Sequence, residues 1–232
     1  MSIFPLTDWI ALFWFLTCWV GYTIYANDKM KRVPNLSQSL TELRGLWMDT
    51  MITREIKIAD VTALVALQRT GTFFASTTIF ILAGLLAVLG ASDKALRLAE
   101  ALPFVAEHSQ AAWETKLLLM ILVFVYAFFK FSWAVRQYNF SLVMFGAAPD
   151  EKTKASKKFT ESANQLLTLA NKSFNYGLRS YTFSMAIIAW FIHPTLFILM
   201  TAWVVGVLFR REFHSRTLAA MTSALKSSGE ES

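Results

Sequence analysis

The stretch from Leu117 to Arg136 reads LLLMILVFVYAFFKFSWAVR and carries one charge, Lys130, before its terminal arginine. A membrane-spanning helix needs about 20 predominantly apolar residues, because each residue advances about 1.5 Å through a hydrocarbon layer about 30 Å thick. The stretch meets that length, which exceeds what the core of a soluble domain requires. It therefore predicts an α-helix that crosses a lipid bilayer.

The composition of the whole chain agrees with a membrane protein. Of its 232 residues, 55% are hydrophobic and 16% are charged. Soluble domains average about 45–50% apolar and about 25% charged residues. The single cysteine, Cys18, excludes an intramolecular disulfide. These features exclude an ordinary soluble enzyme, a disordered chain and a disulfide-stapled secreted domain.

Four stretches of the chain are predicted to span the membrane. They cover residues 9–26, 73–91, 117–136 and 181–209. The fourth contains His193-Pro194, a pair that predicts a kink within one span. We therefore expect an all-α, polytopic membrane protein with four transmembrane helices and long amphipathic cytoplasmic helices, all within a single membrane domain, 1–232.

Basic residues in the connections predict the orientation of these spans. The connections after the first and third spans are rich in Lys and Arg, whereas the one after the second holds only Lys94 and Arg97 beside four acidic residues. Because basic residues collect on the cytoplasmic side, we expect a multi-pass protein of the cytoplasmic (inner) membrane with both termini outside.

The basic tail, residues 210–232, opposes this orientation, because its arginines would favour the cytoplasm. A re-entrant fourth segment, broken at His193-Pro194, would return the tail to the inside. The segment has about 29 residues, too few for two full crossings. Four simple spans are therefore the prediction, and the side of the C-terminus is its weakest point.

Two further regions, 36–70 and 150–175, repeat apolar residues at steps of three and four. They predict amphipathic cytoplasmic helices, the first running almost without a break into the second span. Lys154, Lys157 and Lys158 on the second are candidates for contact with anionic lipid or a protein partner. Alternatively, the helices cover the cytoplasmic end of the bundle with their lysines in water, or join protomers.

Polar residues also occur at helical spacing along the third span. The candidates for a polar or pore-lining face are Tyr126, Lys130, Trp133, Arg136, Gln137 and Asn139. Charges at membrane depth are costly, so such a face should look toward other helices or a watery path. In a ring of copies, its cations would favour anions. Snorkelling to the headgroups remains an alternative, as does pairing with Asp49, Glu55 or Asp60.

The sequence also predicts the placement of individual residues outside that face. Asp8 precedes the first span and is expected to be an exposed helix cap at the outer surface. Lys116 is expected at the outer mouth of the third span, beside Glu114. Gly84 and Gly90 in the second span would permit close helix packing.

Residue patterns for catalysis or metal binding do not occur in the sequence. The three histidines lie far apart, and there are no paired cysteines and no phosphate-binding glycine loop. The basic residues are explained by membrane topology, so nucleic-acid binding is not expected. We expect a protein that is not an enzyme and holds no cofactor and no metal.

Three motifs carry a family resemblance. Phe128–Asn139 (FFKFSWAVRQYN), Gly146-Ala147-Ala148-Pro149 and Arg210–Ser215 (RREFHS) resemble a bacterial and plant integral membrane family catalogued as domain of unknown function 599. The resemblance covers nearly the whole chain. It implies a four-span integral membrane protein without an assigned activity, and it supplies no substrate, cofactor or catalytic residue.

Two functions remain open from the sequence. The first is a homo-oligomeric channel- or transporter-like protein whose third span lines an ion path. The alternative is a non-catalytic scaffold or interaction subunit, which binds a protein partner or anionic lipid through its cytoplasmic helices.

Overall fold

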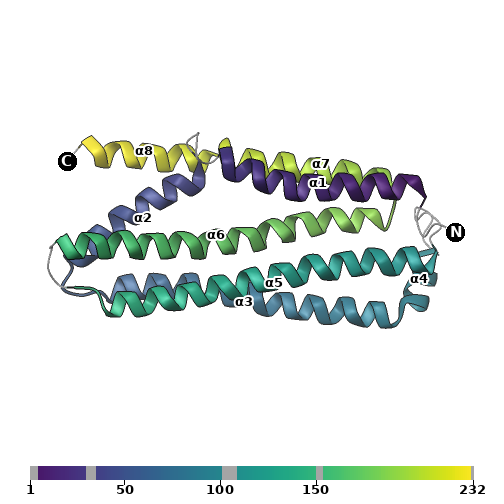
Figure 1. Ribbon diagram of the computed structural model, residues 1–232, viewed down its shortest axis with the longest axis horizontal. Coiled ribbons are helices and arrows are strands. Elements are labelled where there is room, and N and C mark those ends of the chain that lie inside the picture. The colour runs from purple at the N-terminus through teal and green to yellow at the C-terminus, as the bar shows by residue number, and fades with distance from the viewer. Residues whose placement is uncertain (1–4, 30–34, 101–108, 150–153, 231–232) are drawn as a thin grey trace. The chain divides into compact units, whose positions relative to one another are not determined.

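The computed structural model describes residues 5–29, 35–100, 109–149 and 154–230, and within these ranges the chain forms eight helices and no strand (Figure 1). The helices are α1 (Leu6–Lys29), α2 (Leu36–Ile52), α3 (Ile58–Gly90), α4 (Ser92–Glu100), α5 (Gln110–Gly146), α6 (Lys154–Trp190), α7 (Pro194–Phe213) and α8 (Arg216–Glu230). Helices α1, α3 and α5 contain stretches long and apolar enough to cross a membrane. The predicted all-α class is confirmed for the described residues.

The chain divides into two compact units. Unit 1 comprises residues 1–29, 76–128 and 177–209, and unit 2 comprises residues 30–75, 129–176 and 210–232. The boundaries fall inside α3, α5 and α6, so each of these long helices contributes one end to each unit.

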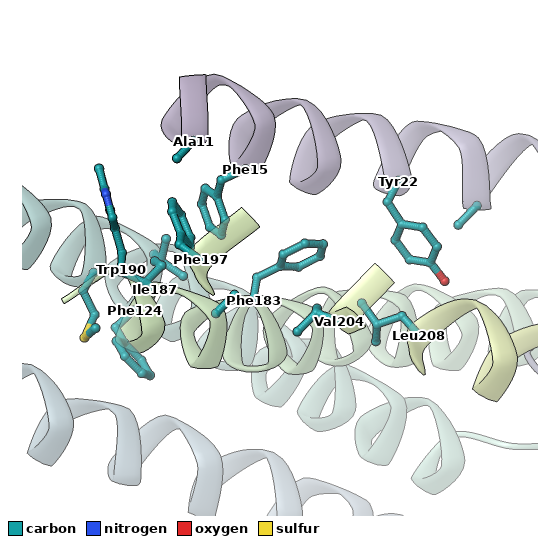
Figure 2. Packing of buried hydrophobic residues seen from close by; sticks show 14 of the residues in the cluster. Ala11, Phe15, Tyr22, Phe124, Phe183, Ile187, Trp190, Phe197, Val204 and Leu208 are labelled. Atoms are coloured by element: carbon teal, nitrogen blue, oxygen red, sulfur yellow. The ribbon is translucent and has the colours of Figure 1, made fainter. Parts of the chain in front are cut away.

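Aromatic side chains form the centre of unit 1 (Figure 2). Phe15 of α1 is fully buried, with its ring centre 5.2 Å from that of Phe197 and 5.9 Å from that of Phe183. Figure 2 shows the Phe15 and Phe197 rings next to each other, with Phe183 projecting from α6 on the side that faces α1. Such ring pairs each contribute about 0.5–1.5 kcal/mol beyond the area they bury.

The predicted fourth span, residues 181–209, is two helices instead of one kinked helix, so this prediction is wrong. Helix α6 ends at Trp190 and α7 begins at Pro194, running back alongside the end of α6 (Figure 1). Proline has no backbone N–H to donate inside a helix, so it disrupts a continuous helix, but it is favourable at the first helical position. The Nδ1 atom of His193 accepts the backbone N–H of Thr195 at 3.2 Å, which caps the new helix. Residues 191–193 are therefore a turn.

Unit 2 has its own core, centred on Met48 and Met51 of α2, Leu64 of α3 and Leu167 of α6, all at most 1% exposed. Helix α2 begins after Asn35, whose Oδ1 atom accepts the backbone N–H of Gln38 at 2.9 Å. It also packs against α8. Side-chain hydrogen bonds supplement this core, and they join α2 to α6 and α5 to α6.

The first predicted cytoplasmic region, 36–70, contains a break that its apolar pattern did not predict. Helix α2 ends at Ile52 and α3 starts at Ile58. Asp60, in the first turn of α3, is buried and accepts the indole N–H of Trp47 at 2.6 Å. It also forms an ion pair with Arg54 of the turn. A carboxylate is favourable at a helix N-terminus, so Asp60 holds both helices at this turn.

Close packing occurs at Gly71, and the expectation of it at Gly84 and Gly90 is wrong. A Cβ atom added at Gly71 would lie 2.9 Å from Cγ2 of Val135, whereas one added at Gly84 or Gly90 would meet nothing within 4 Å. Val135 is β-branched and stiff. Gly71 is therefore the glycine that allows α3 to approach α5 within unit 2.

We expect Gly71→Ala to lower the stability of the detergent-purified protein by about 1–3 kcal/mol, because the added methyl overpacks this contact. Thermal unfolding followed by tryptophan fluorescence measures the effect. Gly84→Ala is the matched control, which should be neutral or stabilising by up to about 1 kcal/mol. Equal behaviour of the two variants would contradict the close approach.

Candidate functional site

A buried ionic cluster, formed by Asp8, Lys116 and Trp190, joins α1, α5 and α6 within unit 1. Lys116 has no exposed surface, and its Nζ atom donates to the backbone carbonyl of Trp190 at 3.0 Å. The same atom lies 3.4 Å from Oδ1 of Asp8 and 5.1 Å from the centre of the Trp190 ring. The indole N–H of Trp190 donates to that aspartate oxygen at 2.6 Å. Each member thus contacts the other two.

The helix ends explain why this cluster is stable. Trp190 is the last residue of α6, where backbone carbonyls lack partners within the helix and carry the negative end of its dipole. Asp8 lies in the first turn of α1, at the positive end of that dipole. The ammonium group of Lys116 satisfies the carbonyl and neutralises the carboxylate. The cluster therefore compensates three groups that would be costly to bury separately.

The expectation that Asp8 is an exposed cap is wrong, because Asp8 is 5% exposed. Lys116, expected at the mouth of the third span, is fully buried beside the first turn of α1 and the last residue of α6. Glu114, its expected neighbour, instead accepts hydrogen bonds from Ser92 at 2.8 Å and Gln110 at 2.9 Å. The sequence could have suggested this pair. Lys116 precedes an apolar stretch and needs a counter-charge at membrane depth, and Asp8 lies at the start of another apolar stretch.

The predicted polar face of α5 is divided between different environments. Gln137 is buried, and its Oε1 atom accepts from the hydroxyl of Ser173 on α6 at 3.0 Å. Trp133 is 49% exposed, and Arg136 and Asn139 are also exposed. Tyr126 is partly exposed and packs edge-on against Trp19, with ring centres 5.7 Å apart. A single chain therefore does not gather these six residues around one path.

The two cations of this face contact aromatic rings. Lys130 is half-buried, with its Nζ atom 5.4 Å from the ring centre of Tyr176. The guanidinium of Arg136 lies 5.6 Å from the ring centre of Phe140. Two of the carboxylates considered as their partners are engaged within unit 2: Asp60 by Trp47 and Arg54, and Asp49 by Thr160.

The predicted lipid- or partner-binding lysines lie at the start of α6. Lys157 and Lys158 are exposed. Lys154 is the first residue of the helix, and its side chain lies outside the described part of the structure, as do residues 150–153 of the predicted 150–175 region. Thr160 holds this end of α6 to α2 through a 3.0 Å hydrogen bond to Asp49.

Two further observations on the described residues concern possible sites. No group of three or more His, Cys, Asp or Glu side chains there is arranged to hold a metal ion. An open depression of about 240 Å³ on unit 1 is lined by Trp19, Val20, Thr23, Ile24 and Tyr126. Its walls are mostly apolar, which suits contact with lipid chains.

Comparison with known proteins places the chain in a family. A family model described as "Protein of unknown function, DUF599" matches residues 10–217, nearly the whole chain. No curated protein and no solved structure matches the chain.

The buried cluster predicts strongly coupled substitutions. Asp8→Asn should destabilise the protein by about 3–5 kcal/mol, because it leaves the Lys116 ammonium buried without a counter-charge. Lys116→Met should also destabilise, since it leaves the carboxylate unpaired. The double variant Asp8→Asn/Lys116→Met should lose less than the sum, with a coupling of about 1–3 kcal/mol.

Thermal unfolding of all three purified variants completes this double-mutant cycle. Asp93→Asn, which removes an exposed carboxylate from α4, is the control and should change stability by less than about 0.5 kcal/mol. Strict additivity of the two cluster substitutions would show that the charges do not depend on each other.

Proposed function

The chain belongs to the DUF599 family of unknown function, and we propose that it is a multi-pass protein of the cytoplasmic membrane that forms homo-oligomeric, channel- or transporter-like assemblies. In this proposal unit 1 is the membrane bundle and the segments of unit 2 are cytoplasmic. The proposal revises the four predicted spans to five crossings.

The distribution of charge between the two units carries the topological part of the proposal. The segments of unit 2 contain 17 of the 22 Lys and Arg residues of the chain, whereas those of unit 1 contain only five. Segments beside membrane spans that are enriched in basic residues remain on the cytoplasmic side. The charge bias therefore favours one side of the membrane for all three segments of unit 2.

The order of the helices agrees with this charge bias. Helix α1 makes one crossing from outside to inside. Residues 76–128 leave unit 2 through α3 and return through α5, and residues 177–209 leave through α6 and return through α7. Each of these two segments is a helical hairpin that crosses the membrane twice. The basic tail after Phe209 therefore lies on the cytoplasmic side.

The crossings of α6 and α7 are short. Their parts in unit 1, residues 177–190 and 194–209, extend about 21 Å and about 24 Å at 1.5 Å per residue. Both lengths are less than a hydrocarbon core of about 30 Å, and local thinning of the bilayer accommodates such a mismatch at modest cost.

Cysteine labelling in intact cells distinguishes five crossings from four. In a Cys18→Ala background, we expect Ser227→Cys to react with a membrane-impermeant maleimide only after permeabilisation, because five crossings leave α8 inside. Lys94→Cys on α4 should react in intact cells and serves as the outside control. Labelling of Ser227→Cys in intact cells would support the four-span topology instead.

The packing of unit 1 favours a path between copies over a path through one chain. Its interior is filled by the aromatic and aliphatic side chains around Phe15, Phe183 and Phe197. The one lysine inside it, Lys116, is enclosed by Asp8 and Trp190. In this proposal the polar route therefore lies at an interface between protomers.

The exposed face of α5 in unit 2 supports such an interface. Side chains recur there at steps of four and three: Phe129, Trp133, Arg136, Phe140 and Val143. The four apolar members are 65%, 49%, 43% and 73% exposed, respectively. This spacing forms a straight seam along a helix and is the one that pairs helices in coiled coils. A second copy of α5 would cover the apolar members, and Arg136 of each copy would place positive charge at the cytoplasmic mouth.

Flux measurements in proteoliposomes test the ion path. We expect the protein to pass small ions, and Arg136→Gln to reduce the preference for chloride over potassium by about tenfold, because the charge concentrates anions at the mouth. Arg97→Gln on α4 removes another exposed arginine outside the seam and should leave the preference unchanged. A flux equal to that of empty liposomes would contradict the channel proposal.

The exposed pair Lys157 and Lys158 favours a second function, a scaffold that binds a protein partner or anionic lipid at the start of α6. In that case gentle solubilisation should recover a heteromeric complex, which Lys157→Glu/Lys158→Glu should dissociate. Recovery of a homo-oligomer alone would favour the channel.

A further inference from the structure

Polar side chains from three helices of unit 2 form a polar junction, which comprises Arg44 of α2, Tyr138 of α5, and Asn164, Thr168 and Asn171 of α6. The amide nitrogen of Asn164 donates to the backbone carbonyl of Thr41, one turn before Arg44, at 3.1 Å. The hydroxyl of Tyr138 donates to Asn171 at 3.0 Å, and Tyr138 also interacts electrostatically with Arg44. The three α6 residues follow one another at steps of four and three, so they share one face of that helix.

The charge of Arg44 has no acidic partner among the described residues. Its Nε atom donates to the carbonyl of Leu40 in its own helix at 3.0 Å, which leaves its two terminal nitrogens for other groups. Glu42, two positions earlier, instead accepts from Gln38 at 3.0 Å. Burial lowers the pKa of Arg44, and the neighbouring Tyr138 opposes this effect. Because a guanidinium partly removed from water is costly without a counter-charge, the junction favours an anion.

Two further atoms of the junction lack hydrogen-bond partners within the part of the chain that the structure describes. They are Oδ1 of Asn164 and Oγ1 of Thr168, and both are buried. A hydroxyl on a helix often donates to the carbonyl four positions earlier, as Ser141 does on α5, but Thr168 does not. Such orphaned atoms are rare and point to a bound water molecule or ion. Arg44, Asn164 and Thr168 are each half-buried, so they also reach the surface of unit 2.

The hydrogen-bonding capacities of these groups favour a phosphate group over other anions. The terminal nitrogens of Arg44 match two oxygens of a phosphate or a carboxylate. The hydroxyl of Thr168 can donate to a third oxygen. Oδ1 of Asn164 only accepts, because the amide nitrogen is already engaged by Thr41, so it requires a donor from the ligand. A phosphate group that retains one proton supplies a P–O–H donor, whereas a carboxylate or a sulfate ion at neutral pH does not.

We propose that Arg44, Asn164 and Thr168 form a binding site for a phosphate group that keeps one P–O–H, carried by inorganic phosphate or by a phosphate monoester. In this site Tyr138 positions Arg44, and Asn171 holds Tyr138 through its hydroxyl. The inference goes beyond the proposed channel activity. It does not depend on the number of membrane crossings either, because all of these residues belong to unit 2.

Isothermal titration calorimetry of the full-length protein in detergent measures this binding. Inorganic phosphate should bind at one site per chain, and sulfate at the same ionic strength should bind at least about tenfold more weakly, because it leaves Asn164 without a donor. Arg44→Gln should weaken phosphate binding by at least about tenfold, because it removes hydrogen bonds from a charged group. Equal binding of sulfate and phosphate, or no phosphate binding at all, would overturn the site and leave the channel proposal untouched.

The control variant is Arg69→Gln, which removes an exposed arginine from the α3 part of unit 2. It should change phosphate binding by less than about twofold, since a charge outside the site acts only through screened attraction. Equal losses in Arg44→Gln and Arg69→Gln would overturn the site in favour of such diffuse attraction.

Thr168→Val keeps the test decisive should Arg44→Gln fail to fold. Valine keeps the branched shape and removes the orphaned hydroxyl, so without phosphate the variant should unfold at the same temperature as the unaltered protein or at a higher one. It should nevertheless bind phosphate about fivefold more weakly, because one hydrogen bond to the ligand is lost. Unchanged phosphate binding in this variant would contradict the proposal.

Glycerol phosphate and dimethyl phosphate test the form of the ligand. Tighter binding of glycerol phosphate than of inorganic phosphate would support the site and assign it to a phosphate monoester, whereas weaker binding would support it with inorganic phosphate as the ligand. Dimethyl phosphate has no P–O–H and should bind at least about tenfold more weakly than inorganic phosphate. Equal binding of dimethyl phosphate would overturn the proposal, because Asn164 would then select nothing.

Discussion

The buried contact between Lys116, Asp8 and Trp190 is the constraint on which the arrangement of unit 1 depends. An ammonium group with no exposed surface has to satisfy its charge and its N–H groups inside the protein. It does so by binding the end of α6 and the start of α1 at once. The same contact holds Trp190 stacked on Phe197, with ring centres 4.9 Å apart, which directs α7 back along α6. A charge pair thus determines which helix ends meet.

Such a pair matters more in lipid than in water. Lipid chains are as apolar as the side chains of a helix, so burying leucine or phenylalanine between helices gives little driving force there. Unit 1 accordingly exposes large apolar residues such as Phe13 at 73% and Phe80 at 77%, which suit contact with lipid. Polar contacts and ring geometry then select one packing among many. Unit 2, which contains most of the Lys and Arg residues, instead combines a core of aliphatic, aromatic and methionine side chains with side-chain hydrogen bonds between its helices.

The sequence predicted the features that depend on a local pattern of residues. It did not predict those that depend on contacts between residues far apart in the chain. Length and hydropathy identified the stretches within α1, α3 and α5 because a span is defined by its own residues. The turn at 191–193 was missed because Pro194 is compatible with both a kink and a helix start, and only the packing of Trp190 on Phe197 separates the two. Gly71 could not be distinguished from Gly84 in sequence, since the difference is the presence of Val135 opposite. Asp8 and Trp190, the partners of Lys116, lie 108 and 74 positions away in the sequence, so no helical periodicity could have predicted these contacts.

The turn before Pro194 also removes the main conflict in the sequence. With an even number of crossings, the basic tail after Phe209 would lie outside while the other basic segments lie inside. In the proposed topology one additional turn makes the number odd, so that Arg210, Arg211 and Arg216 join the other basic segments on one side. The charges of the tail and the hairpin of α6 and α7 are independent observations, because one follows from composition and the other from packing. Their agreement supports a hairpin that begins and ends on the same side of the bilayer, which a single fourth span would not allow.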